Sequence, residues 1–312
     1  MKIVARTGKE DIAMVYTAKT KKGKFTEIVE SLQPPLPRKE KWVIIVSTLY
    51  GCPVNCRFCD CSGYYEGNLT TDEIISLIDY LVMKRFPNKK VPVKKFKIQF
   101  ARIGEPSFNK NVLEVIDCLH ELYDAPGLIP CISTIAPKET NRFFEKLLEI
   151  KKKKYPQKFQ IQFSIHTTNQ KLRDWLIPVK KWDFKRIAEY GETFYDKGGR
   201  KITLNFALAD GMPIDSDILL KYFSPDIFLI KITPVNPTTQ AIKNKLSSTL
   251  TSKKWDKIVN TLHTTGYEVI LSIGELEENH IGSNCGQCIT KHKSTQKSIE
   301  SAYSYKLQNQ RL

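Results

Sequence analysis

Three cysteines lie close together in one short stretch of the chain, and their spacing suits a bound metal or cluster. Cys52, Cys56 and Cys59 form the pattern C-x-x-x-C-x-x-C in a sequence without a secretion signal, which favours thiolate ligands over disulfides. Cys56 and Cys59 alone would suit half of a zinc site, but a closed zinc site needs a fourth ligand. Three thiolates in one loop fit a 4Fe–4S cluster with one iron left open, because cysteine thiolates hold such clusters.

Polar residues follow several apolar, strand-like stretches downstream of these cysteines. Gly104 and Glu105 follow one of them, where a glycine lets the backbone approach a ligand and a carboxylate can bind an ammonium group. Taken singly, a Gly-Glu-Pro turn or a lone histidine is more often structural. Because several such residues end successive strands, we expect them to converge on one pocket. The other members of this set are Ser133, Ser164, His166 and Asn236.

The elements that would position these residues alternate between strand and helix. Apolar spacing predicts helices near 71–82, 112–123, 142–150 and 255–263, and a short strand at 269–271. Units of about 30–50 residues indicate parallel strands joined by right-handed crossovers. Six such strands are too few for a closed eight-stranded barrel, so the predicted fold class is α/β, a partial (β/α)6 barrel with its chemistry at the carboxyl ends of the strands. The six strands are expected at 42–47, 97–100, 130–133, 160–165, 202–206 and 227–232.

The chain is expected to divide into a small extension, the barrel and a tail. Residues 1–40 form the extension: a β-hairpin over 11–31 that turns at 21–24, followed by a proline-rich linker. No separate helical domain is expected ahead of the hairpin. Residues 41–290 form the barrel, and residues 291–312 form a basic, polar tail.

Composition limits the compartment and the partners. The 312 residues include no apolar run long enough to span a membrane and no signal peptide, so a cytoplasmic protein without membrane contact is expected. A reducing cytosol keeps thiols free to hold a cluster. The formal net charge of +16 favours a polyanionic partner, RNA above all, although solvated basic faces would give the same balance.

The ordered motifs resemble a known family. The cysteine pattern is similar to the signature of radical S-adenosylmethionine (SAM) enzymes, in which SAM chelates the open iron. The order of motifs from about residue 11 to residue 290 resembles the RlmN/Cfr family of radical SAM RNA methyl synthases. Besides the cysteine loop, the motifs are Gly-Glu-Pro at 104–106, Ser-Thr at 133–134, Ser-Ile-His-Thr-Thr-Asn at 164–169 with Arg173 and Ile-Pro at 177–178, Pro-Val-Asn-Pro at 234–237, and Asn-Cys-Gly-Gln at 284–287.

The resemblance implies a role for each of these residues. Cys285 would carry a methyl group, which it receives from one SAM by nucleophilic displacement. A second SAM, cleaved at the cluster, would give a 5′-deoxyadenosyl radical that activates this methyl group for addition to an adenine ring carbon in RNA. Glu27 matches the position of a hairpin glutamate thought to accept a proton, and an ordinary surface strand glutamate is the alternative. The resemblance also implies SAM contacts from Gly104, Glu105, Ser133, Ser164, His166 and Asn236. A flavodoxin- or ferredoxin-type electron donor and a monomer are expected as well.

Two departures from the family pattern bear on this expectation. The family has a second cysteine seven residues before the first cluster cysteine, and Ile45 stands there in this chain. Cys288 and Cys61 are candidate stand-ins, and a Cys285/Cys288 pair could resolve a protein–RNA crosslink by thiol–disulfide exchange. The family also carries a helical RNA-binding domain before its hairpin, so the RNA target, whether rRNA or tRNA, does not follow from the resemblance.

Two other functions stay open at this point. The same machinery could act on a protein, a peptide or a small molecule, which the absent helical domain and Ile45 favour and the net charge opposes. A catalytically silent, RNA-binding or cluster-carrying relative is the other alternative. The presence of all three cluster cysteines together with Glu105 and Cys285 opposes it.

Overall fold

A computed structural model of the chain describes residues 1–32, 36–248, 252–272, 281–283 and 289. Its main element is a ten-stranded sheet in the order β1-β2-β3-β4-β7-β8-β9-β10-β11-β12, open between the edge strands β1 and β12 in the described part of the chain. The strands are β1 (Lys2–Lys9), β2 (Ala13–Lys19), β3 (Phe25–Ser31), β4 (Lys41–Val46), β7 (Lys95–Phe100), β8 (Leu128–Thr134), β9 (Gln160–Ser164), β10 (Ile202–Leu208), β11 (Phe228–Pro234) and β12 (Val269–Leu271).

From β4 onward every neighbouring pair of strands is parallel. This confirms the predicted α/β class with its mostly parallel sheet, and all six predicted strands are present. The predicted hairpin is also present as β2 and β3, which pair antiparallel on either side of the turn at 20–24. β3 in turn pairs antiparallel with β4, so the hairpin and the parallel strands share one sheet. Strand β1, which was not predicted, extends this sheet at its edge.

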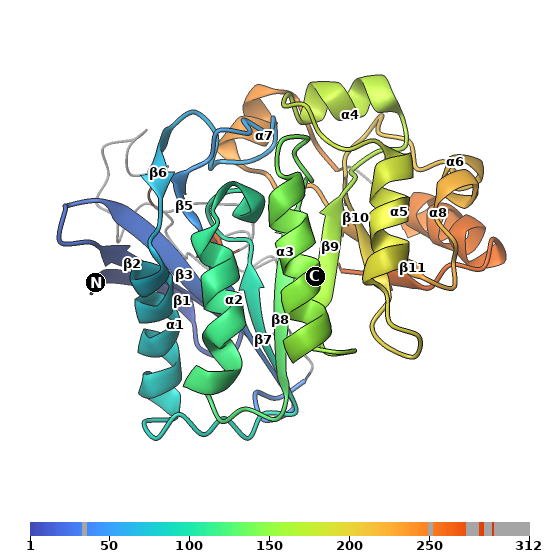
Figure 1. The fold of residues 1–312 in the computed structure, drawn as a ribbon. Coiled ribbons are helices and arrows are strands. Elements are labelled where there is room, and N and C mark those ends of the chain that lie inside the picture. The colour runs from blue at the N-terminus through green and yellow to red at the C-terminus, as the bar shows by residue number, and fades with distance from the viewer. Residues whose placement is uncertain (33–35, 249–251, 273–280, 284–288, 290–312) are drawn as a thin grey trace.

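Helices cover one face of the sheet (Figure 1), which we call the outer face. The helices are α1 (Thr71–Arg85), α2 (Asn111–Leu122), α3 (Asn141–Lys154), α4 (Gln170–Leu176), α5 (Phe184–Phe194), α6 (Ser216–Tyr222), α7 (Thr239–Lys243) and α8 (Ser252–Thr264), with a 3₁₀ turn at Pro106–Phe108. A short second sheet pairs β5 (Leu49–Gly51) with β6 (Tyr65–Asn68). None of the helices in the described ranges has the length and apolar character needed to cross a membrane.

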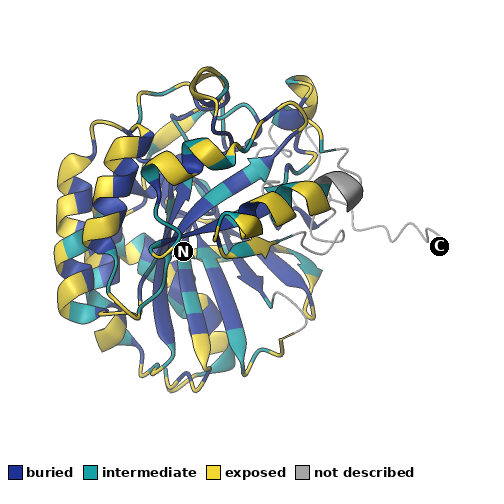
Figure 2. Cartoon of the chain, turned by 90° about the vertical axis from the view of Figure 1, so that its right-hand side faces the viewer, coloured by how far each residue is buried: buried dark blue, intermediate teal, exposed yellow. Residues whose placement is uncertain are grey.

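The hydrophobic core lies between the outer face and these helices. Alternate residues of β7, Phe96, Ile98 and Phe100, are fully buried there, whereas Lys97 and Gln99 on the opposite face are partly exposed. Each such buried side chain contributes roughly 1.5–3 kcal/mol. Figure 2 shows the same contrast, with buried strands beneath helices whose outward sides are exposed. The opposite face, which we call the inner face, is therefore open to polar side chains.

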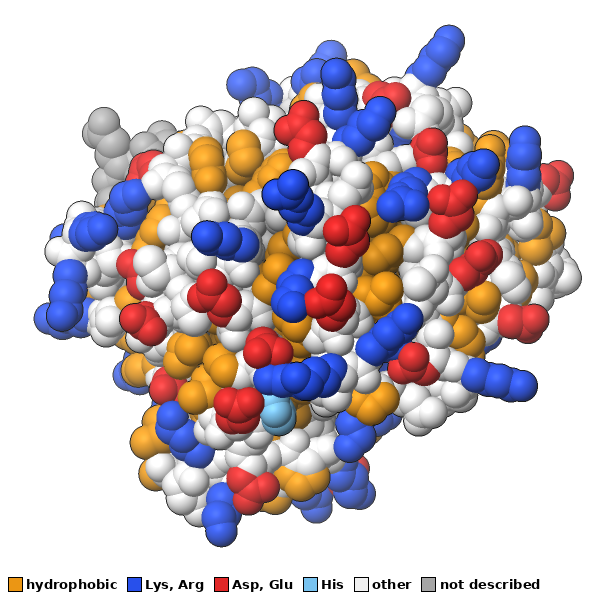
Figure 3. All heavy atoms as spheres, viewed as in Figure 1, with side chains coloured by type: hydrophobic (Ala, Val, Ile, Leu, Met, Phe, Trp, Pro, Cys, Tyr) orange, Lys and Arg blue, Asp and Glu red, His pale blue; other side chains and the backbone are white. Residues whose placement is uncertain are grey.

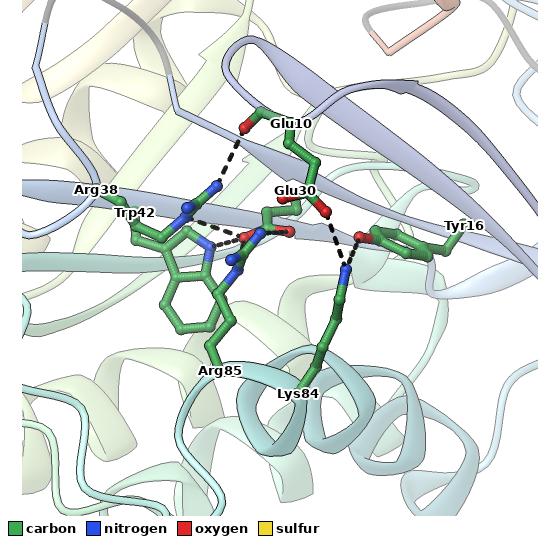
Figure 4. Close-up of polar contacts among 7 residues, drawn as sticks. All are labelled: Glu10, Tyr16, Glu30, Arg38, Trp42, Lys84 and Arg85. Atoms are coloured by element: carbon green, nitrogen blue, oxygen red, sulfur yellow. Dashed lines mark hydrogen bonds and ion pairs between the residues drawn. The ribbon is translucent and has the colours of Figure 1, made fainter.

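A buried carboxylate fastens the hairpin to α1 (Figure 4). Glu30 of β3 points to the outer face, where both of its oxygens accept from the guanidinium of Arg85, Oε2 at 2.7 Å. Trp42 Nε1 donates to Glu30 Oε1 at 2.9 Å, and Arg38 forms a further ion pair with that oxygen. Because the Glu30 side chain is almost completely buried, these partners replace the water that it gives up on folding.

Candidate active site

The cysteine loop lies between β5 and β6, over the carboxyl ends of the parallel strands. Thr48 and Leu49 donate their backbone N–H groups to Ile103 O, just after β7. Arg57 N donates to Leu176 O at the end of α4. Cys52, Cys56 and Cys59 are all free thiols and partly exposed. The loop is thus held at the edge of the sheet where barrel enzymes carry out their chemistry.

The three thiols affect one another's titration. Burial and then the charge of Cys59 raise the pKa of Cys52 to about 12, and burial also raises the pKa of Cys56. The sulfurs therefore lie near enough to influence one another, and ligation would release their protons. Within the described ranges, no three His, Cys, Asp or Glu side chains could share one metal ion. A cluster does not require this, because each of its cysteines binds a different iron.

The segment that follows β11 holds the cysteine loop in place. Thr238 Oγ1 donates to Phe58 O at 2.7 Å and also accepts from Ala241 N as the N-cap of α7. The carboxylate of Asp60 accepts from the backbone of Thr239 and Gln240, the latter at 2.9 Å. Sequence reasoning missed these residues. The only sequence feature that points to them is a threonine ahead of a short helix, which is a common N-cap.

Gly104 and Glu105 lie directly after β7, but the carboxylate of Glu105 is already occupied. Its oxygens accept from Ser107 N and Oγ, from Thr134 Oγ1 and from Ile135 N at 2.9 Å. Burial raises the pKa of Glu105, and these four donors oppose that shift. Gly104 has φ of +100°, and a Cβ there would lie 2.4 Å from the Leu49 side chain. The Gly-Glu pair thus shapes the loop after β7.

His166 is buried just beyond β9 and is neutral. Its Nδ1 accepts from Ala207 N at 2.9 Å, which leaves the proton on Nε2. Burial, and then the charge of Arg173, lower the pKa of His166 to about 3. The ring contacts Phe58 of the cysteine loop edge-on, with 4.8 Å between ring centroids. His166 therefore connects the ends of β9 and β10 to that loop.

The remaining predicted SAM contacts also lie at this edge of the sheet. Ser133 is the next-to-last residue of β8 and accepts from Gln99 Nε2 at 3.1 Å. Ser164 ends β9, and Asn236 follows β11 in the turn before Thr238. Because β7, β8, β9, β10 and β11 are consecutive in the sheet, the structure brings these residues to one edge, around the cysteine loop.

Glu27 lies on the inner face of β3 in a fully buried ion pair with Arg102, so the surface interpretation of Glu27 is wrong. Arg102 lies just after β7, and its NH2 and Nε groups are 2.8 and 3.0 Å from Glu27 Oε2. The same guanidinium donates to Gly282 O at 2.7 Å and to Ser283 O at 2.9 Å. Ile289 N donates to Glu27 Oε1 at 2.9 Å. Both oxygens of the carboxylate are therefore in use.

The residues that flank Cys285 and Cys288 are thus tied to the hairpin. Cys285 and Cys288 themselves lie outside the described residues. Ile289 packs with Cys61 and Ile103, next to Cys52 and Cys59. Cys61 is buried and its Sγ donates to Arg102 O at 3.5 Å.

Ile45 packs in a small apolar cluster on the inner face. Its neighbours include Val15, Val29 and Ile281. The position where the family has its second cysteine is therefore an apolar contact with the segment at 281–283.

Comparison with known proteins agrees with this geometry. No family model matches the chain. A probable dual-specificity RNA methyltransferase RlmN from Thermotoga petrophila is 29% identical over 208 residues, covering 64% of this chain and 56% of that protein. The protein of the same name from Prochlorococcus marinus strain NATL2A is 27% identical over 235 residues, covering 72% and 62%. The chain thus spans about three-fifths of the length of these curated relatives.

Solved structures share the fold. A radical SAM methyltransferase from Sphaerobacter thermophilus superposes with a TM-score of 0.70 at 20% identity, over 92% of this chain and 80% of that chain. A spore photoproduct lyase gives a TM-score of 0.50 at 10% identity, over 72% and 76%. Together, the matched relatives, the shared fold and the cysteine loop at the strand ends support the assignment of the chain to the radical SAM family of the RlmN/Cfr type.

Proposed function

We propose that the protein is a SAM-dependent radical methyl synthase that methylates an adenine ring carbon in RNA through a methylated Cys285. The observation that carries the proposal is the gathering of three free thiols and a ring of polar strand-end residues at one edge of a parallel sheet. The names of the RlmN relatives support methyl transfer to RNA.

Each part of the proposed site has a role for the chain's own residues. Cys52, Cys56 and Cys59 would hold a 4Fe–4S cluster, which when bound supplies the electron that cleaves SAM. Ser133, Ser164, His166 and Asn236 would contact SAM. The neutral Nε2–H of His166 is suited to donate a hydrogen bond to it.

Glu105 has a different role in this proposal. Four donors from the chain already occupy its carboxylate, so Glu105 acts mainly by fixing the loop that carries Gly104. The absence of a side chain at Gly104 makes room for Leu49, so that β5 packs closely against this loop.

The segment on either side of Cys285 supports its assignment as the methyl carrier. Arg102 binds the backbone of Gly282 and Ser283, and Glu27 binds the backbone of Ile289. These contacts give Glu27 and Arg102 a positioning role. A proton-accepting role for Glu27 would require its carboxylate to leave this ion pair.

We propose that RNA approaches the strand-end edge rather than the helix-covered face. On the outer face, lysine and arginine side chains are interspersed with aspartate and glutamate (Figure 3). A mixed surface of this kind does not give the single-sign field that attracts a polyanion. We therefore propose that the excess positive charge, +16 in total, attracts RNA to a face other than the one covered by helices.

Anaerobic turnover with SAM, a chemical reductant and RNA tests the proposal. The wild-type protein should release 5′-deoxyadenosine and produce methylated adenine in the digested RNA, and Cys56→Ala should do neither. Absence of 5′-deoxyadenosine would refute the radical SAM activity. Release of 5′-deoxyadenosine without methylated RNA would favour a protein, peptide or small-molecule substrate. A flavodoxin- or ferredoxin-type protein is the proposed natural reductant.

A further inference from the structure

Four cations lie together on the inner face, at the end of the sheet away from the cysteine loop. Lys41 opens β4 and is paired with Lys95, which opens β7, and Lys97 points to the same face two residues later. Arg200 lies just before β10 and reaches Gln160 on β9. Because β7 has six residues, roughly 16 Å of strand separates Lys95 from the strand end at which the cysteine loop lies.

Two of these cations share one neutral acceptor. Lys97 Nζ donates to Gln160 Oε1 at 2.8 Å, and an NH2 group of Arg200 donates to the same oxygen at 3.1 Å. Arg200 Nε is buried without a hydrogen-bond partner. A lysine ammonium has three donor N–H groups and a guanidinium has five. The single oxygen of Gln160 accepts from only one N–H group of each side chain, so it satisfies a minority of their donors.

No carboxylate among the described residues forms an ion pair with Lys41, Lys95, Lys97 or Arg200. Lys151 and Lys181, whose side chains are almost completely buried, each have one: Lys151 lies 2.5 Å from Asp196, and Lys181 lies 2.6 Å from Asp174.

Burial and, to a lesser extent, neighbouring positive charges change the titration of Lys97 and Lys41. The pKa of Lys97 is lowered to about 8, mainly by burial; Cys131 opposes this shift, and the charges of Arg200, Lys41 and Lys231 add to it. Burial and then the charges of Lys231, Lys95 and Arg200 also lower the pKa of Lys41. At neutral pH Lys97 still carries its proton, so the repulsion among these cations persists.

We propose that these four residues form a binding site for a phosphate group. Phosphate suits the arrangement because it offers up to two negative charges and several acceptor oxygens, and guanidinium binds it bidentately. The side chains of Lys41, Lys97 and Arg200 are partly buried, and that of Lys95 is exposed. A phosphate bound among them would be shielded from water, which strengthens its hydrogen bonds to the protein. The phosphate belongs either to an RNA backbone or to a free nucleotide, since both present the same chemistry.

Thermal unfolding of the full-length protein in sodium phosphate, without SAM, tests the site. Sodium chloride at equal ionic strength separates specific binding from screening. The wild-type midpoint should rise saturably with phosphate alone, and Lys97→Gln or Arg200→Gln should weaken the apparent affinity about tenfold. Lys146→Gln is the matched control, because Lys146 is an exposed lysine paired with Glu149 on α3 and should leave the response unchanged. Equal responses in wild type and Lys97→Gln, or no saturable rise, would overturn the proposal.

Two further ligands identify the source of the phosphate. A short RNA oligonucleotide with hydroxyl ends carries phosphate only in its backbone, whereas adenosine monophosphate carries it as a free end group. Loss of affinity in Lys97→Gln for the oligonucleotide indicates RNA, and loss for the nucleotide alone indicates a small ligand. Unchanged affinity for both would refute the site. These binding measurements contain no SAM, so they do not depend on the methylation reaction. The proposed phosphate site and the proposed methylation activity can therefore be refuted independently.

Discussion

Replacing Arg102 by methionine should release the segment at 281–283 from the hairpin and destabilise the whole protein. Arg102 and Glu27 are both almost completely buried, with 1% and 0% of their side chains exposed. The substitution removes the ion pair and both bonds to the carbonyls of Gly282 and Ser283, and it leaves the Glu27 carboxylate buried without its cation. Breaking a buried pair in this way typically costs about 3–5 kcal/mol.

This loss is large enough to measure and small enough to leave a folded protein. Domains have a free energy of unfolding of about 5–15 kcal/mol, so the variant should fold with a clearly lower urea midpoint. The Ile289 amide should also exchange its hydrogen at least about tenfold faster, because its acceptor Glu27 is no longer fixed and every 1.4 kcal/mol is a factor of ten.

Arg85→Met is the matched control, because it breaks a similar ion pair on the opposite face of the same strand. Arg85 binds Glu30, which is as buried as Glu27 but points to α1. The control should lose a similar or smaller amount of stability while the Ile289 amide keeps its wild-type exchange rate. Equal exchange rates in Arg102→Met and wild type would show that the pair does not hold this segment, and the reasoning would be wrong.

Three further substitutions test other parts of the structure. In urea titrations, Gly104→Ala should lower the free energy of unfolding by more than the control Gly198→Ala does. Both glycines have positive φ, but only at Gly104 would the new Cβ meet a side chain, at 2.4 Å. Thr238→Val should cost about 1 kcal/mol and reduce the iron bound per chain, because the loss of its bond to Phe58 O loosens the cysteine loop. With the pKa of Lys97 lowered to about 8, mainly by burial, the unfolded chain binds more protons above that pH. Thermal unfolding should therefore show the wild type becoming more stable relative to Lys97→Gln between about pH 8 and about pH 10, and a constant difference in stability would contradict the lowered pKa.

The elements predicted well are those with a local pattern. The β-branched run at 42–47 and the regular apolar spacing after Thr71 each repeat within a few residues, so a strand and a helix follow directly. α1 also begins at the predicted residue because Thr70 and Glu73 cap it reciprocally. The five residues of α7 are too few to show a period, and β1 at the sheet edge alternates too weakly to be recognised.

Contacts between distant residues could not be predicted in the same way. Glu27 lies 75 residues before Arg102, and Phe58 lies 180 residues before Thr238. No local spacing relates such pairs, because tertiary packing alone brings them together. The cysteine loop could be predicted because its three cysteines lie close together in the sequence. Thr238, which holds this loop in place, could not be predicted because it lies far away in the sequence. Lys97 likewise resembles any other strand lysine until the register places it on the same face as Lys41 and the fold brings it and Arg200 to Gln160.

Intact mass of anaerobically purified, cluster-loaded protein after incubation with SAM tests the central claim most directly. The proposed methyl carrier predicts a gain of one methyl group in the wild type and none in Cys285→Ala. Loss of the gain in Cys285→Ala but not in Cys288→Ala would assign the methyl group to Cys285. An unchanged mass in the wild type, with 5′-deoxyadenosine released, would contradict the methyl-carrier mechanism and leave a radical SAM enzyme of another kind.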